Sequence, residues 1–246
     1  MDYGLVRAVL ILLLLLPPAY WDLRTREIEP KYWVLAGVIV AFSSLISYKD
    51  ILAWDHRLLM VYIITSLLVL GVLTISYLAG IMGGADLFAL AMISIGVPES
   101  YMGSVLGIPF LTLLYASLAS MVLPVSFCIG NIIKYRRHLR NRPKILCLLG
   151  LPFTAERLSK NPGFWFPLEI YDEDGNKKIR FSFNVEEEPE DIRRQFKKLL
   201  DKGILNKDDI IYSTPGIPFI IFIVIGYIIG ILFGDTPITT FLGVIT

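Results

Sequence analysis

The sequence is poor in cysteine and in charged residues. Only 2 of the 246 residues are cysteines, so the chain has neither a disulfide framework nor cysteine pairs spaced as metal ligands. Charged residues make up 18%, against about 25% in an average soluble domain. The formal net charge is +1, which argues against a generally basic nucleic-acid-binding protein. We therefore expect neither a small disulfide-bonded fold nor a nucleic-acid partner.

Histidines and the usual catalytic motifs are also scarce. The two histidines, His56 and His138, have no cysteine or carboxylate cluster near them in the sequence, which favours loop or surface positions over metal binding. No nucleophile elbow or Ser–Lys arrangement is recognisable, and residues 80–84 lack the Gly-Lys-Ser/Thr ending of a phosphate-binding loop. The sequence thus predicts no metal and no cofactor.

What the sequence has instead is long hydrophobic runs. Hydrophobic residues make up 55% of the chain and gather in runs close to the length that crosses a bilayer. The first run fits a spanning helix better than a signal peptide, because its end at residues 17–20 is not a small-residue cleavage site. The fourth run is short, and the fifth is long and contains Pro109 and Pro124. The sequence therefore predicts an α-helical integral membrane protein with six transmembrane helices, at residues 5–20, 32–47, 58–79, 85–97, 103–133 and 217–233.

The basic residues predict which way these helices cross. They are frequent in the loop after the first run and above all just after the fifth. The loop after the second run has only Lys49 and Arg57, and the segments after the third, fourth and sixth runs have none. Because cytoplasmic loops carry an excess of Lys and Arg, the loops after the first, third and fifth helices should be cytoplasmic. We expect a multi-pass protein of the cell membrane with both termini outside. The residues that carry this argument are Arg24, Arg26, Lys31, Lys134, Arg136, Arg137, Arg140, Arg142 and Lys144.

Between the fifth and sixth runs the composition changes to that of a water-soluble domain. Residues 164–171 and 177–185 are rich in aromatic and β-branched residues and flank a turn sequence, which predicts a β-hairpin. Residues 187–202 begin with acids and have apolar residues on one face, which predicts a helix that stops at Gly203. We therefore expect a small α+β cytoplasmic domain inserted before the last helix. The predicted domains are transmembrane helices 1–5 at residues 1–133, the cytoplasmic domain at 134–212, and helix 6 with the C-terminal tail at 213–246.

Two aspartates lie at the ends of spanning segments, where a carboxylate is costly and predicts a functional role. Asp22 is at the end of the first helix, and Asp86 is at the start of the fourth, after Gly83, Gly84 and Ala85. The orientation inferred from the basic residues puts both at the cytoplasmic face, although the aspartates were not used to infer it. Each also has a structural interpretation, because Asp22 could pair with a neighbouring arginine and Asp86 could cap its helix.

Two aspartates that face each other at a wet membrane edge can hydrolyse an amide. When they approach closely, one keeps its proton while the other is ionised. The ionised one can take a proton from an attacking water, and the protonated one can bind the carbonyl oxygen and then protonate the leaving nitrogen. The sequence does not assign these two roles. A third carboxylate, Asp235, lies beyond the last helix and is interpreted as a solvated terminus.

Both aspartate segments resemble a known family. Residues 22–30, Asp-Leu-Arg-Thr-Arg-Glu-Ile-Glu-Pro, resemble the first motif of the membrane aspartyl peptidases that process type IV pilin-like precursors, with Glu29 inserted before the proline. Residues 83–86 resemble the second motif of that group, Gly-x-Gly-Asp, with Ala85 in place of the second glycine, as in its archaeal variant. The size, the six helices and the soluble insert are most similar to those of archaeal preflagellin (prearchaellin) peptidases.

This resemblance implies a reaction, a substrate and a site. Asp22 and Asp86 would be the catalytic residues, with Gly83, Gly84 and Ala85 as a substrate-binding segment in which small residues let another backbone approach. The reaction would be removal of the short basic leader from preflagellin or pilin-like precursors at the cytoplasmic membrane face. The partners would be these precursors and the lipid bilayer, and no cofactor is expected.

The basic leader also suggests a role for an acidic stretch. Binding of the leader by the acidic residues that precede the predicted cytoplasmic helix is one interpretation, and a solvated helix start whose acids suit the macrodipole is the other. The acids proposed to bind the leader are Glu186, Glu187 and Glu188.

Two other functions would use the same features. A proton-coupled membrane transporter could relay protons through the same carboxylates. Transporter sites usually lie near the middle of the membrane between repeated halves, whereas both aspartates lie near one predicted face and no internal repeat is visible. A non-catalytic assembly protein of a pilus or flagellum is the second alternative.

Overall fold

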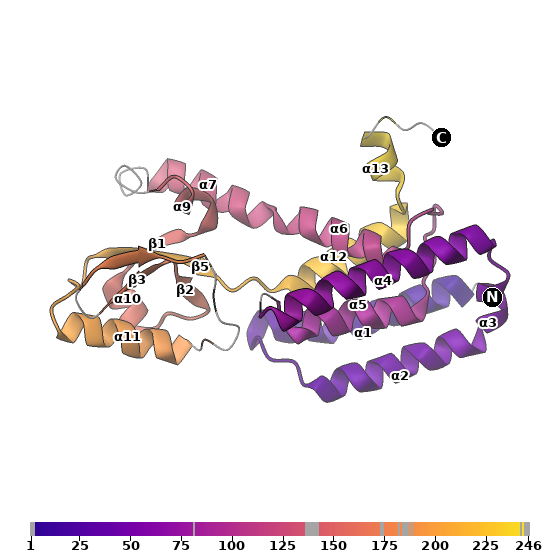
Figure 1. The fold of residues 1–246 in the computed structure, drawn as a ribbon, viewed down its shortest axis with the longest axis horizontal. Coiled ribbons are helices and arrows are strands. Elements are labelled where there is room, and N and C mark those ends of the chain that lie inside the picture. Colours follow the sequence, from indigo (N-terminus) through magenta and orange to yellow (C-terminus); the bar gives the residue numbers. More distant parts are fainter. Residues whose placement is uncertain are drawn as a thin grey trace. The chain divides into compact units, whose positions relative to one another are not determined.

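The chain divides into two compact units in the computed structural model. The structure describes residues 3–80, 82–135, 143–172, 175–181, 183, 187, 189–241 and 243. Within these residues the chain is mostly helical, with a small sheet region. Unit 1 comprises Met1–Ser120 and Pro218–Thr246, and unit 2 comprises Met121–Ile217 (Figure 1).

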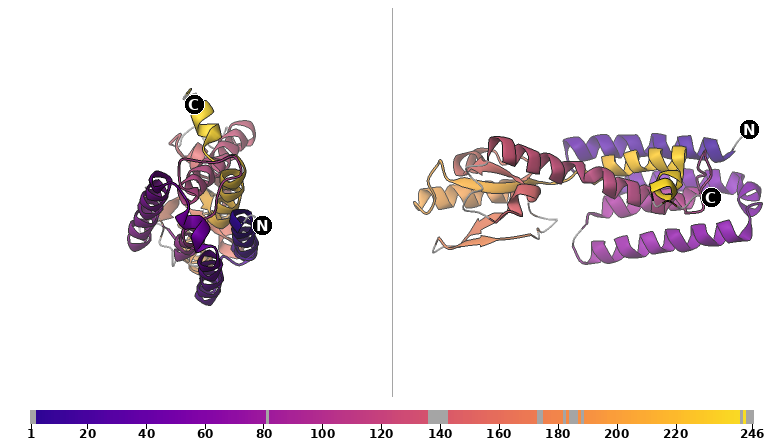
Figure 2. Two further views of the ribbon diagram at one scale, coloured as in Figure 1. Left: turned by 90° about the vertical axis from the view of Figure 1, so that its right-hand side faces the viewer. Right: turned by 90° about the horizontal axis from the view of Figure 1, so that it is seen from above.

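Unit 1 is a bundle whose long helices run roughly along a common direction (Figures 1 and 2). Helix α12 packs against α6 and α1, and α5 packs against α2 and α4. The packed faces bury apolar side chains, whereas the outer faces of α2 and α4 expose them, as lipid-facing surfaces do. The helices of unit 1 are α1 (Tyr3–Arg24), α2 (Pro30–Ile46), α3 (Tyr48–Leu52), α4 (His56–Leu78), α5 (Gly84–Gly96), α6 (Ile108–Ser120), α12 (Phe219–Phe233) and α13 (Thr236–Phe241).

The prediction of six spans is confirmed only in part. Among the described residues, Tyr3–Arg24, His56–Leu78 and Ile108–Lys134 are long and apolar enough to cross a membrane. Helices α2, α5 and α12 are apolar but have only 17, 13 and 15 residues. Helix α5 is short because Val97 adopts a left-handed conformation, φ 43°, and is followed by Pro98, a combination that ends a helix. The structure therefore supports three clear spans together with shorter apolar helices.

Prolines shape two of these helices. Pro124 has no N–H and its ring would meet the carbonyl of Ser120, and the long fifth run is accordingly divided, with α6 ending at Ser120. Pro18 lies inside α1 and leaves the carbonyl oxygen of Leu14 without its helical donor. The hydroxyl of Tyr32 on α2 donates to this oxygen at 2.6 Å. The tyrosine thus satisfies a group that the proline would otherwise leave exposed to hydrocarbon.

Gly226 lets α12 lie directly against α6. A methyl group at Gly226 would overlap the carbonyl oxygen of Thr112 and would lie 2.6 Å from the amide nitrogen of Ala116. One turn further along the same helix, a methyl group at Gly230 would meet its nearest neighbour, the Cβ of Leu111, at an ordinary 3.5 Å. Small residues four positions apart are a common way for membrane helices to approach closely.

We expect Gly226→Ala to destabilise unit 1 and Gly230→Ala to leave it nearly unchanged. The first methyl group meets backbone atoms that cannot rotate away, and such overpacking costs about 1–3 kcal/mol of unfolding free energy. Thermal unfolding of the two purified variants in the same detergent measures the difference. Equal unfolding temperatures for both variants would show that the α12–α6 contact is looser than described.

Unit 2 has helices packed against small antiparallel sheets. Among the described residues, the larger sheet has the strand order β1-β5-β2, and β3 and β4 form a separate pair. Helices α10 and α11 cover a core in which Leu158, Phe196 and Ile211 are fully buried. The elements are α7 (Val122–Lys134), α9 (Leu146–Leu149), β1 (Leu151–Thr154), α10 (Ala155–Lys160), β2 (Trp165–Pro167), β3 (Glu169–Tyr171), β4 (Lys177–Ile179), α11 (Pro189–Asp201) and β5 (Ile210–Pro215).

The predicted hairpin and helix of this unit are both confirmed, with shorter bounds. Strands β3 and β4 pair antiparallel, with Tyr171 opposite Lys177, and the helix is α11, after which Gly203 has φ 70°. The first half of the predicted strand 164–171 instead pairs with β5, which the hairpin signal could not indicate. The chain changes partner at Glu169, whose buried carboxylate accepts a hydrogen bond from the amide of Tyr212 at 2.9 Å.

Some sequence predictions fall outside the described residues. The middle of the predicted turn does so, as does most of the basic cluster after the fifth run. The predicted domain boundaries at 133 and 212 stay predictions. The residues concerned are Glu173, Asp174, Arg136, Arg137, His138, Arg140 and Arg142.

Candidate active site

Asp22 lies in the last turn of α1, against the first turn of α12. The backbone amide of Ile220 donates to its Oδ2 at 3.2 Å, and Nη1 of Arg26 is 3.8 Å from its Oδ1. Helix α12 begins after Pro218, whose side chain makes no capping hydrogen bond. The Asp22 carboxylate therefore takes the place of an N-cap side chain for α12. Its side chain is 15% exposed. The predicted pairing with a neighbouring arginine therefore exists, together with a second contact from a distant segment.

Asp86 is the third residue of α5 and is partly buried. The helix is preceded by Gly83 as its N-cap, and within the described part of the chain the Asp86 carboxylate makes no hydrogen bond or ion pair. Its negative charge and that of Asp22 act on each other, so the two carboxyl groups lie within electrostatic range. The fold thus brings two aspartates from separate helices to the same end of unit 1, where α12 also begins.

The small residues before Asp86 leave open space beside the backbone of Gly83. Gly83 is extended, with φ −73° and ψ 149°, and a Cβ placed there would have no neighbour within 4 Å. At Gly84 a Cβ would lie 3.3 Å from the ring of Tyr77, and Ala85 is partly buried beside it. The space beside Gly83 is compatible with another backbone approaching the Asp86 side of the pair.

The acidic stretch predicted to bind the leader belongs to unit 2 and is described in part. Glu187 forms a two-point ion pair with Arg180, at 2.7 and 2.8 Å, and Glu190 pairs with Arg193 at 2.6 Å. Glu186 and Glu188 lie outside the described residues. A basic peptide would therefore have to compete with Arg180 for Glu187, and leader binding by these acids stays a prediction.

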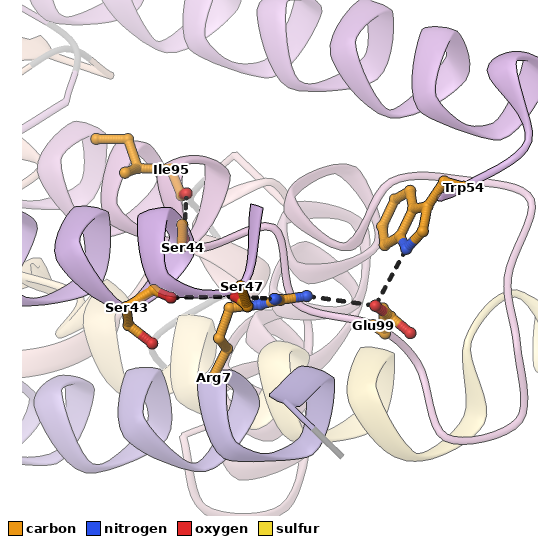
Figure 3. A network of polar contacts seen from close by, with 7 residues as sticks. All are labelled: Arg7, Ser43, Ser44, Ser47, Trp54, Ile95 and Glu99. Carbon is orange, nitrogen blue, oxygen red and sulfur yellow. Dashed lines mark hydrogen bonds and ion pairs between the residues drawn. The ribbon is translucent and has the colours of Figure 1, made fainter. Parts of the chain in front are cut away.

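A second polar cluster, drawn in Figure 3, was not predicted and lies near the start of α1, at the other end of this helix from Asp22. Arg7, in the first turns of α1, is 1% exposed and donates to the hydroxyl of Ser47. The Nη2 atom of Arg7 is 3.3 Å from Oε1 of Glu99, and this oxygen also accepts a hydrogen bond from the indole N–H of Trp54 at 3.1 Å. The cluster joins α1 to the segments that follow α2, α3 and α5. One arginine within an otherwise apolar run was the available signal, because an ionisable residue in a spanning segment needs a partner.

Fold and site together define a helical membrane protein with a pair of carboxylates at one end of its bundle. A model of the type IV leader peptidase family matches residues 8–125, which contain both aspartates. A second model, described as archaeal peptidase A24 C-terminus type II, matches residues 142–236. Together they match most of the chain, which therefore belongs to the type IV leader peptidase family. No curated protein matches the chain significantly.

Family membership confirms the resemblance inferred from the two motifs. The protein is a membrane peptidase of the prepilin and preflagellin type, and its C-terminal part matches the archaeal form. As a leader peptidase it acts on precursor proteins. Sequence reasoning found both aspartates from their costly positions, but it could not find the contact of Asp22 with Ile220, which joins segments 198 positions apart.

Proposed function

We propose that this peptidase removes the short basic leader of preflagellin or pilin-like precursors, and that Asp22 and Asp86 are its catalytic pair. The observation that carries the proposal is that two partly buried aspartates from α1 and α5 lie within electrostatic range at one end of unit 1. Two neighbouring carboxylates in such a site share a proton rather than both ionising, which supplies a base and an acid at the same pH.

The reaction follows from this shared proton. The ionised carboxylate removes a proton from a water molecule, and the water oxygen bonds to the carbonyl carbon of the leader junction. The protonated carboxyl stabilises the carbonyl oxygen by a hydrogen bond and then gives its proton to the leaving nitrogen as the carbon–nitrogen bond breaks. The open backbone at Gly83 is where the unwound peptide would lie.

The same proposal includes an orientation. The excess of basic residues after the first and fifth hydrophobic runs supports a cytoplasmic location for the aspartate end of unit 1 and for unit 2, with both termini outside. Cleavage would then take place before the precursor leaves the cytoplasmic side, next to the helix that follows its leader.

A transporter function has less support. Both aspartates lie at one end of the bundle rather than midway along their helices, where the relay sites of transporters usually lie. Membership in a peptidase family also provides no argument for transport.

Cleavage of a defined precursor tests the proposal. The purified protein in detergent is mixed with a preflagellin that carries its leader, and product is followed by gel shift and mass spectrometry. The parent protein should release an intact leader, and Asp22→Asn and Asp86→Asn should not, while expression and unfolding temperature remain near those of the parent. A parent protein that cleaves nothing, or an asparagine variant that cleaves normally, would overturn the proposal.

We expect cleavage to be insensitive to metal chelators. The proposed pair activates water with its own protons, and within the described ranges no three His, Cys, Asp or Glu side chains cluster as metal ligands. The assay is repeated after dialysis against EDTA, and the expected rate is within about twofold of the untreated rate. Inhibition by EDTA that zinc reverses would contradict a mechanism based on the aspartates alone.

A further inference from the structure

The two aspartates of the proposed pair are held by different surroundings. Asp22 accepts a hydrogen bond from the amide of Ile220 and lies 3.8 Å from the guanidinium of Arg26. Both contacts favour its negatively charged form, the first because the N-terminus of a helix carries partial positive charge. Asp86 has no hydrogen bond or ion pair in the described part of the chain, and the charge that acts on it is the negative one of Asp22.

We propose that Arg26 is a positioning residue that, with the first turn of α12, keeps Asp22 ionised, so that Asp22 acts as the base and Asp86 as the acid. This inference rests on the proposed function. Among the described residues, the charged and titratable groups that face Asp22 are Arg26 from the segment after α1 and Asp86 from α5, and α12 contributes the amide of Ile220.

The backbone at Arg26 supports a specific role for its side chain. Arg26 has φ 62°, a left-handed conformation that non-glycine residues rarely adopt and that usually places a glycine just after a helix. The amides of Thr25 and Arg26 both donate to the carbonyl of Trp21, which closes the end of α1 and turns the chain back. Glycine would make this turn without strain, but it has no side chain to reach Asp22. An arginine held in such a conformation points to a functional constraint.

With these roles every proton is accounted for. Asp22 takes a proton from water as the oxygen bonds to the carbonyl carbon, and Asp86 gives its proton to the leaving nitrogen as the carbon–nitrogen bond breaks. After cleavage Asp22 is protonated and Asp86 is ionised. Transfer of one proton from Asp22 to Asp86, directly or through water, restores the starting state. The hydrogen bond from Ile220 and the charge of Arg26 favour that transfer, because they act on Asp22 and not on Asp86.

Arg26→Gly tests the inference because glycine keeps the left-handed turn and removes only the side chain. Arg26→Lys restores a positive charge, and Arg24→Ala is the matched control, since the exposed Arg24 stacks on Tyr20 at 5.4 Å and is not in contact with Asp22. The measurement is the pH dependence of kcat and KM for precursor cleavage, with unfolding temperatures to confirm that each variant folds.

In Arg26→Gly, the acidic limb of the pH–rate profile should move to higher pH by about one unit or more, and KM should stay within about twofold of the parent value. Arg26→Lys should move the limb back toward the parent position, and Arg24→Ala should not shift it. An unmoved limb in Arg26→Gly, or a change in KM alone, would overturn this role for Arg26. That result would leave the proposed function intact. The proposed function itself is overturned only if the Asp22→Asn or Asp86→Asn variant still cleaves the precursor normally, or if the parent protein does not cleave it.

Discussion

Asparagine in place of either Asp22 or Asp86 is expected to lower the rate of precursor cleavage by about 10³-fold or more. Asparagine has nearly the volume of aspartate, so the packing of α1 and α5 should survive. It can neither accept a proton from water nor deliver one to the leaving nitrogen. Both members of the pair are needed because one supplies the base and the other the acid, and the loss should therefore appear in kcat rather than in KM.

The double variant provides the sharper comparison. If the aspartates act as one unit, Asp22→Asn combined with Asp86→Asn should be no slower than the more damaged single variant. Asp235→Asn is the matched control, because this carboxylate lies just beyond α12 and accepts a hydrogen bond from the amide of Val105 at 2.9 Å. Losses that simply multiply in the double variant, or equal loss in Asp235→Asn, would argue against a catalytic pair.

Glu99→Ala is expected to destabilise unit 1 by about 3 kcal/mol, which is near the low end for breaking a buried ion pair. Arg7 is 1% exposed and its charge is balanced by Glu99 at 3.3 Å, so removing the carboxylate leaves a buried cation without its counter-ion. The low end applies because the Glu99 side chain is 43% exposed, and water can partly take its place. The hydrogen bond from the indole of Trp54 is lost as well.

A second substitution separates charge from packing. Arg7→Met combined with Glu99→Ala removes both charges and fills most of the arginine volume, so it should be more stable than Glu99→Ala alone. Glu156→Ala serves as the control, because its ion pair with Lys160 is exposed to solvent and its loss should leave the unfolding temperature nearly unchanged. Unfolding temperatures in detergent measure all three variants. A double variant less stable than Glu99→Ala would show that Arg7 stabilises the bundle mainly through packing.

Much of the fold could be predicted from local patterns. Hydrophobic runs indicated the apolar helices, and helix α11 and the β3–β4 hairpin followed from their periodicity and turn residues. The sequence predictions and the structure differ where a local pattern does not reveal the partner or the exact length of an element. Residues 165–167, predicted as part of the hairpin, pair instead with β5, far along the chain. The fifth run is long enough to cross a membrane as a single span, as predicted, but it is divided near Pro124 into α6 and α7. Six spans are not confirmed because three apolar helices are short.

The candidate site was found in the sequence only as two isolated positions. Asp22 and Asp86 are conspicuous because carboxylates are rare at the ends of spanning segments, and their flanking residues match the family motifs. The roles of the two aspartates stayed open because they depend on partners that no spacing predicts. Arg26 was visible as one of two arginines after Asp22, but its left-handed backbone and its approach to the carboxylate appear only in the folded chain.

By itself, the sequence determined that this protein is a helical membrane peptidase of the type IV leader family, and it indicated Asp22 and Asp86 as the candidate catalytic pair. Hydropathy and short motifs are local properties, so they can be read without knowing the fold. Only the tertiary structure decided that the first turn of α12 contacts Asp22 and that α6 packs closely against α12 at Gly226. It also decided that Arg7 pairs with Glu99, 92 positions further along the chain. Such contacts depend on how whole helices pack, and the free energy of that packing is shared among many side chains that no local pattern records.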